Sequence, residues 1–296
     1  MYPPPFAYER PASLEDAVEL LARHDGEVEM LAGGHSLLPR LKLRESHPDL
    51  IVDINVVPDL AGGVDVDGVV AIPSLTRHVE VARSAAIEAA VPLLTDVAAR
   101  IGDPQVRNAG TIGGAAAEIY PGGDWAPALI STGADLVCQG PSGQRRLPAG
   151  EQFASGDAVA LSPDEILVRV EVPVAQEGTG GAHLRLERRM GLAVCNCSAQ
   201  VTLDEQGAYL AVAAAWGGLR PAPVVAVLDE FLIGESPSAD LHRRAAVAAV
   251  EAVESFTDVR GSAAYRKKVG AVILARALDA AARRAKGEKV EVRDVI

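Results

Sequence analysis

The chain has few cysteines and few aromatic residues, and both shortages narrow its class. Three of the 296 residues are cysteine, at Cys138, Cys195 and Cys197. An odd count without a Cys-x-x-Cys pair argues against a disulfide framework and against a metal site, so we expect three small core residues and no bound metal. Aromatic residues amount to 4% of a chain that is 49% hydrophobic. The core is therefore expected to consist mainly of small aliphatic side chains.

Positive charge is also scarce. The chain has 28 Lys and Arg residues against 40 Asp and Glu, a formal net charge of −12. Such a surface repels nucleic-acid phosphates, so we expect no nucleic-acid partner. No apolar run approaches the roughly 18 residues of a membrane span. The opening MYPPP has no basic region followed by an apolar segment, so no secretory signal is expected and a cytoplasmic location is predicted.

What the chain does have is two glycine pairs in similar settings. Gly33 and Gly34 lie in LAGGHSLLP, and Gly113 and Gly114 lie in GTIGGA, about 80 residues further on. Glycine lets backbone N–H groups approach an anion closely, and successive free N–H groups form a concave anion site. A following helix start would add partial positive charge. Together the two loops suggest a site for both ends of a long, phosphate-bearing cofactor.

Simpler interpretations stay open beside this one. Either glycine pair alone is equally compatible with a plain turn, and only the combination with hydroxyls at Ser36 and Thr111 favours a phosphate site. His35 fits a hydrogen bond to loop carbonyls as well as a cofactor contact, and covalent attachment to a flavin is a minority option. Asp124 suits a sugar or ribityl hydroxyl, and it equally suits the N-cap of a helix that begins at Trp125.

Hydrophobic periodicity predicts an α+β fold of two lobes followed by a separate domain. The first lobe is expected over about residues 1–56, the second over 57–175, and the C-terminal domain over 176–296, with a linker at 176–181. That last domain is predicted to combine a three-stranded antiparallel sheet with a helical bundle. The expected helices are 13–24, 36–43, one capped by Thr76, 84–90, 93–101, 124–130, 241–253 and 263–285. The expected strands are 28–31, 50–54, 69–72, 135–139, 145–148, 166–172, 183–188, 198–203 and 209–216.

Several segments, in the same order along nearly the whole chain, carry a family resemblance. They are PPFAYERP at 3–10, AGGHSLLP at 32–39, DPQVRNAGTIGG at 103–114, PGGD at 121–124, LSPDEIL at 161–167 and RGSAAYR at 260–266. With these segments the chain resembles the FAD-binding medium subunit of molybdenum hydroxylases, of the carbon monoxide dehydrogenase and xanthine dehydrogenase type. The resemblance implies an FAD-binding fold of the vanillyl-alcohol oxidase class, in which two α+β lobes hold an extended FAD.

The resemblance also assigns expected roles to single residues. It implies that the pyrophosphate and adjoining groups are bound by Ala32, Gly33, Gly34, His35, Ser36 and Leu37 and by Gly110, Thr111, Ile112, Gly113 and Gly114. By the same resemblance, Asp124 meets a cofactor hydroxyl, and the Leu161 backbone lies near the isoalloxazine. Ile101 holds an apolar position near the adenine end. Arg185 stands where relatives have a lysine near the flavin ring. No residue is assigned a catalytic acid or base role.

The chain departs from the family pattern around the ring. Ala115 replaces an asparagine, and Gly191-Leu192-Ala193 replaces Gly-Asp-Tyr or Gly-Asp-Phe. By resemblance, the chain is an FAD-dependent oxidoreductase subunit. It would pass electrons from an iron–sulfur small subunit and a molybdenum-cofactor large subunit to an acceptor such as NAD or a quinone. A stand-alone FAD-dependent oxidoreductase, and a non-catalytic subunit with a degenerate flavin site, are the alternatives.

Overall fold

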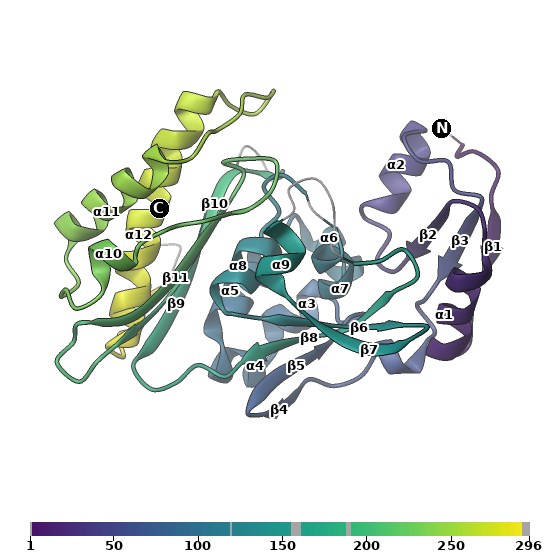
Figure 1. The fold of residues 1–296 in the computed structure, drawn as a ribbon, viewed down its shortest axis with the longest axis horizontal. Helices are drawn as coiled ribbons and strands as arrows, with labels where there is room; N and C mark the ends of the chain where they lie inside the picture. Colours follow the sequence, from purple (N-terminus) through teal and green to yellow (C-terminus); the bar gives the residue numbers. More distant parts are fainter. Residues whose placement is uncertain (1, 119, 155–160, 188–190, 292–296) are drawn as a thin grey trace.

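Three β-sheets, each with its own helices, follow one another along the chain (Figure 1). The computed structural model describes residues 2–118, 120–154, 161–187 and 191–291. In Figure 1 the N-terminal lobe lies on the right, the second sheet in the middle and the C-terminal helices on the left. Each sheet has its own apolar core.

The first sheet is parallel, in the order β1-β3-β2. Its strands are β1 (Ala7–Glu9), β2 (Val28–Leu31) and β3 (Leu50–Asp53), and its helices are α1 (Leu14–Arg23) and α2 (Leu37–Leu43). Ser13 caps α1 as predicted, because its hydroxyl accepts the amide of Asp16 at 3.1 Å. Parallel strands end at the same edge of a sheet, so the segments after β2 and β3 emerge side by side.

The second sheet has the order β4-β5-β8-β6-β7, and all its pairings are antiparallel. Its strands are β4 (Asp65–Asp67), β5 (Val69–Pro73), β6 (Asp135–Gly140), β7 (Gly143–Pro148) and β8 (Ile166–Pro173). The short helices of this part are η1 (Pro58–Leu60), α3 (His78–Arg83), α4 (Ala85–Ala90), α5 (Pro92–Arg100), α6 (Pro104–Ala109), α7 (Ile112–Ala116), α8 (Trp125–Ser131) and α9 (Ala149–Ala154).

The third sheet is antiparallel, in the order β12-β11-β10-β9. It contains β9 (Thr179–Glu187), β10 (Ala193–Leu203), β11 (Tyr209–Gly217) and the short β12 (Val224–Val225), with helices α10 (Asp229–Leu232), α11 (Ala239–Glu251) and α12 (Ala263–Ala285). Helix α12 packs along β9 and β10 (Figure 1). Gly180 allows this approach, because a Cβ there would lie 2.9 Å from the carbonyl carbon of Arg284 and closer still to the Ala281 carbonyl oxygen.

Some local expectations were wrong, each for a physical reason. The predicted linker at 176–181 is partly strand, since Thr179–Gly181 begin β9 and pair with β10. The C-terminal sheet has a fourth short strand. Arg77 rather than Thr76 precedes α3, and Ser36 lies before α2 with helical backbone angles and caps no amide. Residue types that favour helix caps could not predict where these helices and strands begin, because strand pairing and loop contacts set their boundaries.

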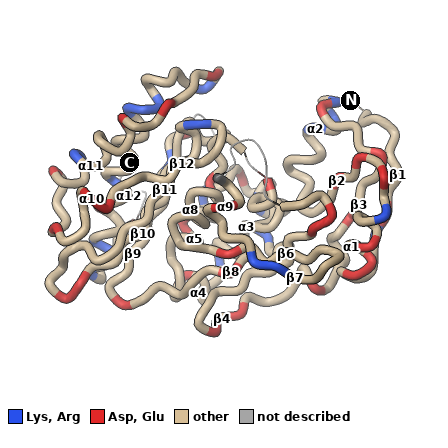
Figure 2. The backbone as a smooth tube through the Cα atoms, viewed as in Figure 1, with Lys and Arg blue, Asp and Glu red and all other residues tan. Residues whose placement is uncertain are grey.

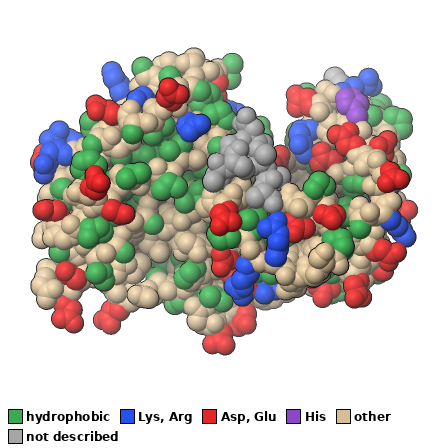
Figure 3. All heavy atoms as spheres, viewed as in Figure 1, with side chains coloured by type: hydrophobic (Ala, Val, Ile, Leu, Met, Phe, Trp, Pro, Cys, Tyr) green, Lys and Arg blue, Asp and Glu red, His purple; other side chains and the backbone are tan. Residues whose placement is uncertain are grey.

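Acidic residues are numerous on the N-terminal lobe (Figure 2). The space-filling view shows a hollow between this lobe and the rest of the molecule (Figure 3). Within the described ranges, no helix has the length and apolar character needed to cross a lipid bilayer.

Candidate functional site

The first glycine loop offers a row of free backbone amides. It follows β2 at the carboxyl edge of the parallel sheet, and Gly34 adopts a positive φ of 72°. Among the described residues, no acceptor binds the amides of Gly33 through Leu37, since the first amide with an acceptor is that of Leu38, which donates to the Gly34 carbonyl at 2.9 Å. The Ser36 side chain is exposed and caps nothing. Consecutive free N–H groups of this kind suit phosphate oxygens.

The second glycine loop has a different character. The amides of Ile112 and Gly113 donate to the carbonyls of Thr76 and Ser74, at 3.0 and 2.9 Å. The Gly114 amide donates to the Thr111 hydroxyl at 3.0 Å. The structure therefore differs from the expectation of two equivalent rows of free amides, because this loop is bound tightly to the strand end that follows β5. The second loop therefore meets the first loop with backbone atoms that are fixed in place.

The two loops are in direct contact. A Cβ on Gly33 would lie 2.8 Å from the Cα of Gly110 and closer still to the Ala109 carbonyl oxygen. His35 adds a second link, since its Nε2 lies 3.3 Å from the Gln105 carbonyl and donates to it. The sequence left open whether His35 binds a loop carbonyl, and the structure shows that it does. Segments far apart in sequence are thus brought together as predicted.

His78 lies behind the second loop and was not expected there. It is 4% exposed, and its Nδ1 accepts a hydrogen bond from the Trp125 indole at 3.2 Å. A Cβ on Gly110 would lie 2.8 Å from its Nε2. Burial lowers the pKa of His78 to about 4, against a smaller opposing effect of Asp124. The ring is therefore neutral at physiological pH and supports the loop without adding charge.

Asp124 forms the centre of a buried polar cluster between the second lobe and the C-terminal sheet. Its Oδ1 accepts from Asn196 Nδ2 at 2.7 Å and from His183 Nε2 at 3.2 Å, and its Oδ2 pairs with Arg185 at 3.1 Å. The Ser198 hydroxyl lies 2.8 Å from Nδ1 of the same histidine. Asp124 occupies the N-cap position of α8, but its side chain caps no amide, so the capping interpretation was wrong. The cluster fixes Asp124 in place from strands β9 and β10.

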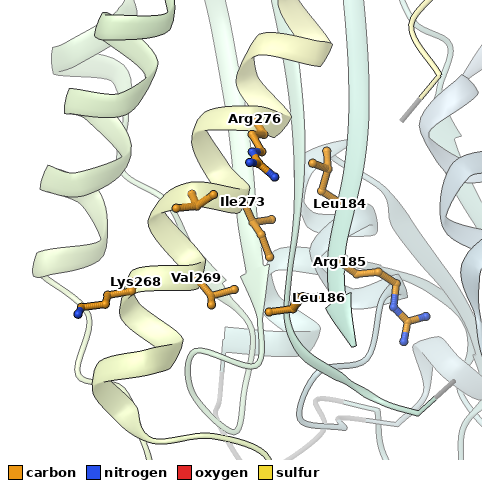
Figure 4. Close-up of a pocket in the computed structure, with 8 residues that line it drawn as sticks. Leu184, Arg185, Leu186, Lys268, Val269, Ile273 and Arg276 are labelled. Carbon is orange, nitrogen blue, oxygen red and sulfur yellow. The ribbon is translucent and has the colours of Figure 1, made fainter. Parts of the chain in front are cut away.

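Arg185 is buried rather than solvated at a strand edge. Besides Asp124, its guanidinium donates to the carbonyls of Arg100 and Gly191. Figure 4 shows its side chain on the opposite side of β9 from Leu184 and Leu186, which line a hollow of about 220 Å³ against α12. That hollow is mostly apolar, and of the described residues of the Asp124 cluster only Arg185 belongs to its lining. We therefore place the candidate site at the loops and not in this hollow.

The other residues that the sequence singled out lie outside the two glycine loops and the Asp124 cluster. Ile101 follows Arg100 directly and is half-buried against the second core, as is Leu161. Within the described ranges, no hydrogen bond joins Leu161 to either glycine loop. Ala115 is also half-buried, Ala193 is buried with its carbonyl against Gly122, and Leu192 is partly exposed.

Sequence reasoning missed Asn55, Arg77, His78 and Asn196. Asn55 follows β3 at the same sheet edge as the first loop, and that position was a usable signal. The other residues gave no local signal, because their partners are 20 or more positions away along the chain.

Two family models cover most of the chain. The first, described as the FAD binding domain in molybdopterin dehydrogenase, matches residues 4–175. The second, the CO dehydrogenase flavoprotein C-terminal domain, matches residues 185–281. This chain belongs to the FAD-binding subunits of the molybdopterin dehydrogenases. It is therefore an FAD-binding dehydrogenase subunit, as its motifs predicted, and its fold is confirmed by solved structures of the same family.

Similar proteins match along almost their full length. The carbon monoxide dehydrogenase medium chain of Hydrogenophaga pseudoflava is 35% identical over 95% of this chain and 98% of that relative. The 6-hydroxypseudooxynicotine dehydrogenase complex subunit alpha of Paenarthrobacter nicotinovorans is 37% identical over 98% of both. A solved structure of the Hydrogenophaga enzyme, lacking the Mo-pyranopterin moiety of its cofactor, superimposes with a TM-score of 0.91 and 36% identity, covering 96% of this chain and 99% of that one.

The residues present fit FAD. Five consecutive amides, which have no acceptor among the residues that the structure describes, and the adjacent Ser36 hydroxyl supply the donors that a pyrophosphate requires. The close contact at Gly33 and Gly110 leaves no room for side chains between the two loops. When bound, FAD supplies the redox chemistry, and the chain supplies binding, orientation and electrostatics.

Proposed function

We propose that this chain is the flavin-carrying subunit of a molybdenum hydroxylase complex. In this role a molybdenum-cofactor large subunit gives electrons to an iron–sulfur small subunit, and the small subunit gives them to this chain. The chain then passes the electrons to an external acceptor such as NAD or a quinone. The observation that carries the proposal is the row of unbonded amides from Gly33 to Leu37 at the carboxyl edge of the parallel sheet.

Within this proposal, the first loop is the main anion-binding element. Its free amides and the Ser36 hydroxyl would hold the pyrophosphate. The second loop, Gly110 to Gly114, would contribute its fixed backbone and the Thr111 hydroxyl, which accepts from Gly114 and keeps its own proton to donate.

The remaining assignments extend outward from the loops. Asp124, held by the buried cluster, would accept from a cofactor hydroxyl with its remaining lone pairs. Ile101, Leu161 and Arg185 keep the roles that the resemblance implies. We also propose the expected domain boundaries, with the FAD-binding domain over residues 1–175, in lobes of about 1–56 and 57–175, and the C-terminal domain over 176–296.

The need for an iron–sulfur partner follows from the cysteines. The three thiols are free and buried, and two lie on one strand, β10. An iron–sulfur cluster commonly needs four cysteine thiolates, so this chain cannot supply one by itself. The relatives include chains named as the medium chain of carbon monoxide dehydrogenase. The free thiols also support the proposed cytoplasmic location, where thiols stay reduced.

Absorption spectroscopy of the purified chain, followed by reduction, tests the proposal. We expect a flavin absorption band after expression or after addition of FAD, and no bleaching with small organic substrates alone. Bleaching is expected only when the iron–sulfur and molybdenum subunits and their substrate are added. Direct bleaching by an organic substrate would support a stand-alone oxidoreductase instead. Failure to bind FAD at all would support a degenerate site.

A further inference from the structure

Two side chains outside both glycine loops connect them. Asn55 follows β3, and Arg77 lies between β5 and α3. The Asn55 side-chain oxygen accepts from Arg77 Nη2 at 2.8 Å. Neither residue belongs to the motifs that carry the family resemblance. We propose that Asn55 and Arg77 are positioning residues that set the spacing of the two loops and thereby the affinity for FAD, an inference that rests on the proposed function.

Asn55 holds the start of the first loop. Its Nδ2 donates to the carbonyl of Ala32 at 2.9 Å and reaches that of Leu31 at 3.2 Å. The same nitrogen lies 2.7 Å from Asp53 Oδ1, and the Asn55 amide donates to that oxygen at 2.9 Å. Asp53 is itself anchored, since the Tyr8 hydroxyl donates to its other oxygen at 2.5 Å. The Asn55 side chain is therefore fixed at both ends, and it fixes the carbonyl that immediately precedes Gly33.

Arg77 holds the second loop from two directions. Its Nη1 donates to the carbonyl of Ala109. Its backbone runs antiparallel to Thr111 in an isolated bridge, flanked by hydrogen bonds from His78 N to Gly110 O and from Ile112 N to Thr76 O, both at 3.0 Å. One guanidinium thus binds the second loop directly and the first loop through Asn55. The guanidinium reaches the two acceptors with two different nitrogens, Nη1 and Nη2, and a lysine has a single nitrogen in their place.

The carbonyl that Arg77 binds is also the one that a side chain at position 33 would strike. Gly33 approaches Ala109 and Gly110 within hard contact of a Cβ position. This contact sets how closely the loops can approach, and the Asn55–Arg77 pair prevents them from moving apart. The loop that carries the amides of residues 33–37 is therefore held at a fixed distance from the second loop. Preorganisation of this kind strengthens binding, because fewer conformations are lost when the ligand binds.

The test compares FAD affinity and stability in the full-length chain. FAD dissociation constants are measured by titrating the cofactor-free protein, and its melting temperature is measured in parallel. We expect Asn55→Ala and Arg77→Met each to weaken FAD binding by about tenfold or more, with little change in the melting temperature of the cofactor-free protein. The double variant should bind no more weakly than the worse single variant, because either change breaks the same connection.

Two further variants separate positioning from simple charge. Arg77→Lys keeps the positive charge but cannot donate to Asn55 and Ala109 together, so it should bind FAD as weakly as Arg77→Met. Arg83→Met removes an exposed arginine from the end of α3 and should bind FAD normally. Full rescue by lysine would show that Arg77 acts through charge alone and would overturn the inference.

The remaining outcomes are also decisive. Additive losses in the double variant, or unchanged affinity in both single variants, contradict the inference. So does a fall in melting temperature large enough to account for the lost affinity. If the wild-type chain itself binds no FAD, the proposed function fails. If the wild-type chain binds FAD and the variants bind it equally well, only the present inference fails.

Discussion

Gly33 and Ala109, 76 positions apart in the chain, are in backbone contact at the centre of the candidate site. A Cβ at position 33 would collide with the Ala109 carbonyl oxygen and lie 2.8 Å from the Gly110 Cα. This contact explains why position 33 is glycine. Backbone angles do not explain it, because Gly34 and not Gly33 has the positive φ. The two residues of the first pair thus serve different purposes.

Gly33→Ala should therefore weaken FAD binding. The methyl group must push the loops apart, and overpacking of this kind typically costs about 1–3 kcal/mol, which corresponds to roughly 5- to 150-fold in affinity. Gly113→Ala should act similarly, since its Cβ would lie 2.6 Å from the Ser74 carbonyl oxygen. The flavin-to-protein ratio after purification measures the effect. Gly63→Ala is the matched control, because nothing lies within 4 Å of its Cβ position. Full flavin content in both loop variants would refute the assigned site.

Gly180→Ala should destabilise the C-terminal domain without touching the loops. The added methyl would meet the backbone of α12 at Ala281 and Arg284, where no flexible side chain can yield. We expect a loss of about 1–3 kcal/mol in the free energy of unfolding, measured by denaturant titration. Gly150→Ala, in a helix with open space around it, should be neutral or stabilising. Equal stability of the two variants would contradict the close packing of β9 against α12.

The neutral His78 predicts a loss of stability in acid. Burial lowers its folded pKa from 6.5 to about 4, so the unfolded chain binds a proton first as the pH falls. The stabilising contribution is complete above pH 6.5 and is lost between there and about pH 4, a change of about 3 kcal/mol. His78→Asn should be less stable than wild type at neutral pH, and this difference should shrink as the pH falls. His47→Gln, at an exposed position, should leave the pH dependence unchanged. Parallel curves for wild type and His78→Asn would contradict the prediction.

The thiols should be inert in the folded protein. Burial raises the pKa of Cys138 to about 11 and also raises the pKa values of Cys195 and Cys197. At pH 8 a thiol-alkylating reagent should label none of them until the chain is denatured, after which all three should react. Ser142→Cys places a thiol at an exposed position in the β6–β7 turn and should label at once. Rapid labelling of the wild type would show that a core opens easily.

Much of the local structure was predictable because its causes are local. Ser13 caps α1, the alternation over β9 to β11 predicted the antiparallel sheet, and α12 begins and ends at the predicted residues. The two glycine loops were also recognisable, because each glycine pair lies next to a hydroxyl residue within a segment that carries the family resemblance. The domain boundaries and the cofactor roles of individual residues remain predictions.

The sequence by itself determined the family, the order of the longer helices and strands and the location of the loops, since these follow from residue types at short spacing. Only the tertiary structure decided that one loop keeps its amides free while the amides of residues 112–114 are bonded within the protein. It also decided that Asp124 is held by Asn196, His183 and Arg185 from strands β9 and β10. The reason is physical: a hydrogen bond depends on the distance between its partners in space, and folding places partners together that are many tens of residues apart along the chain.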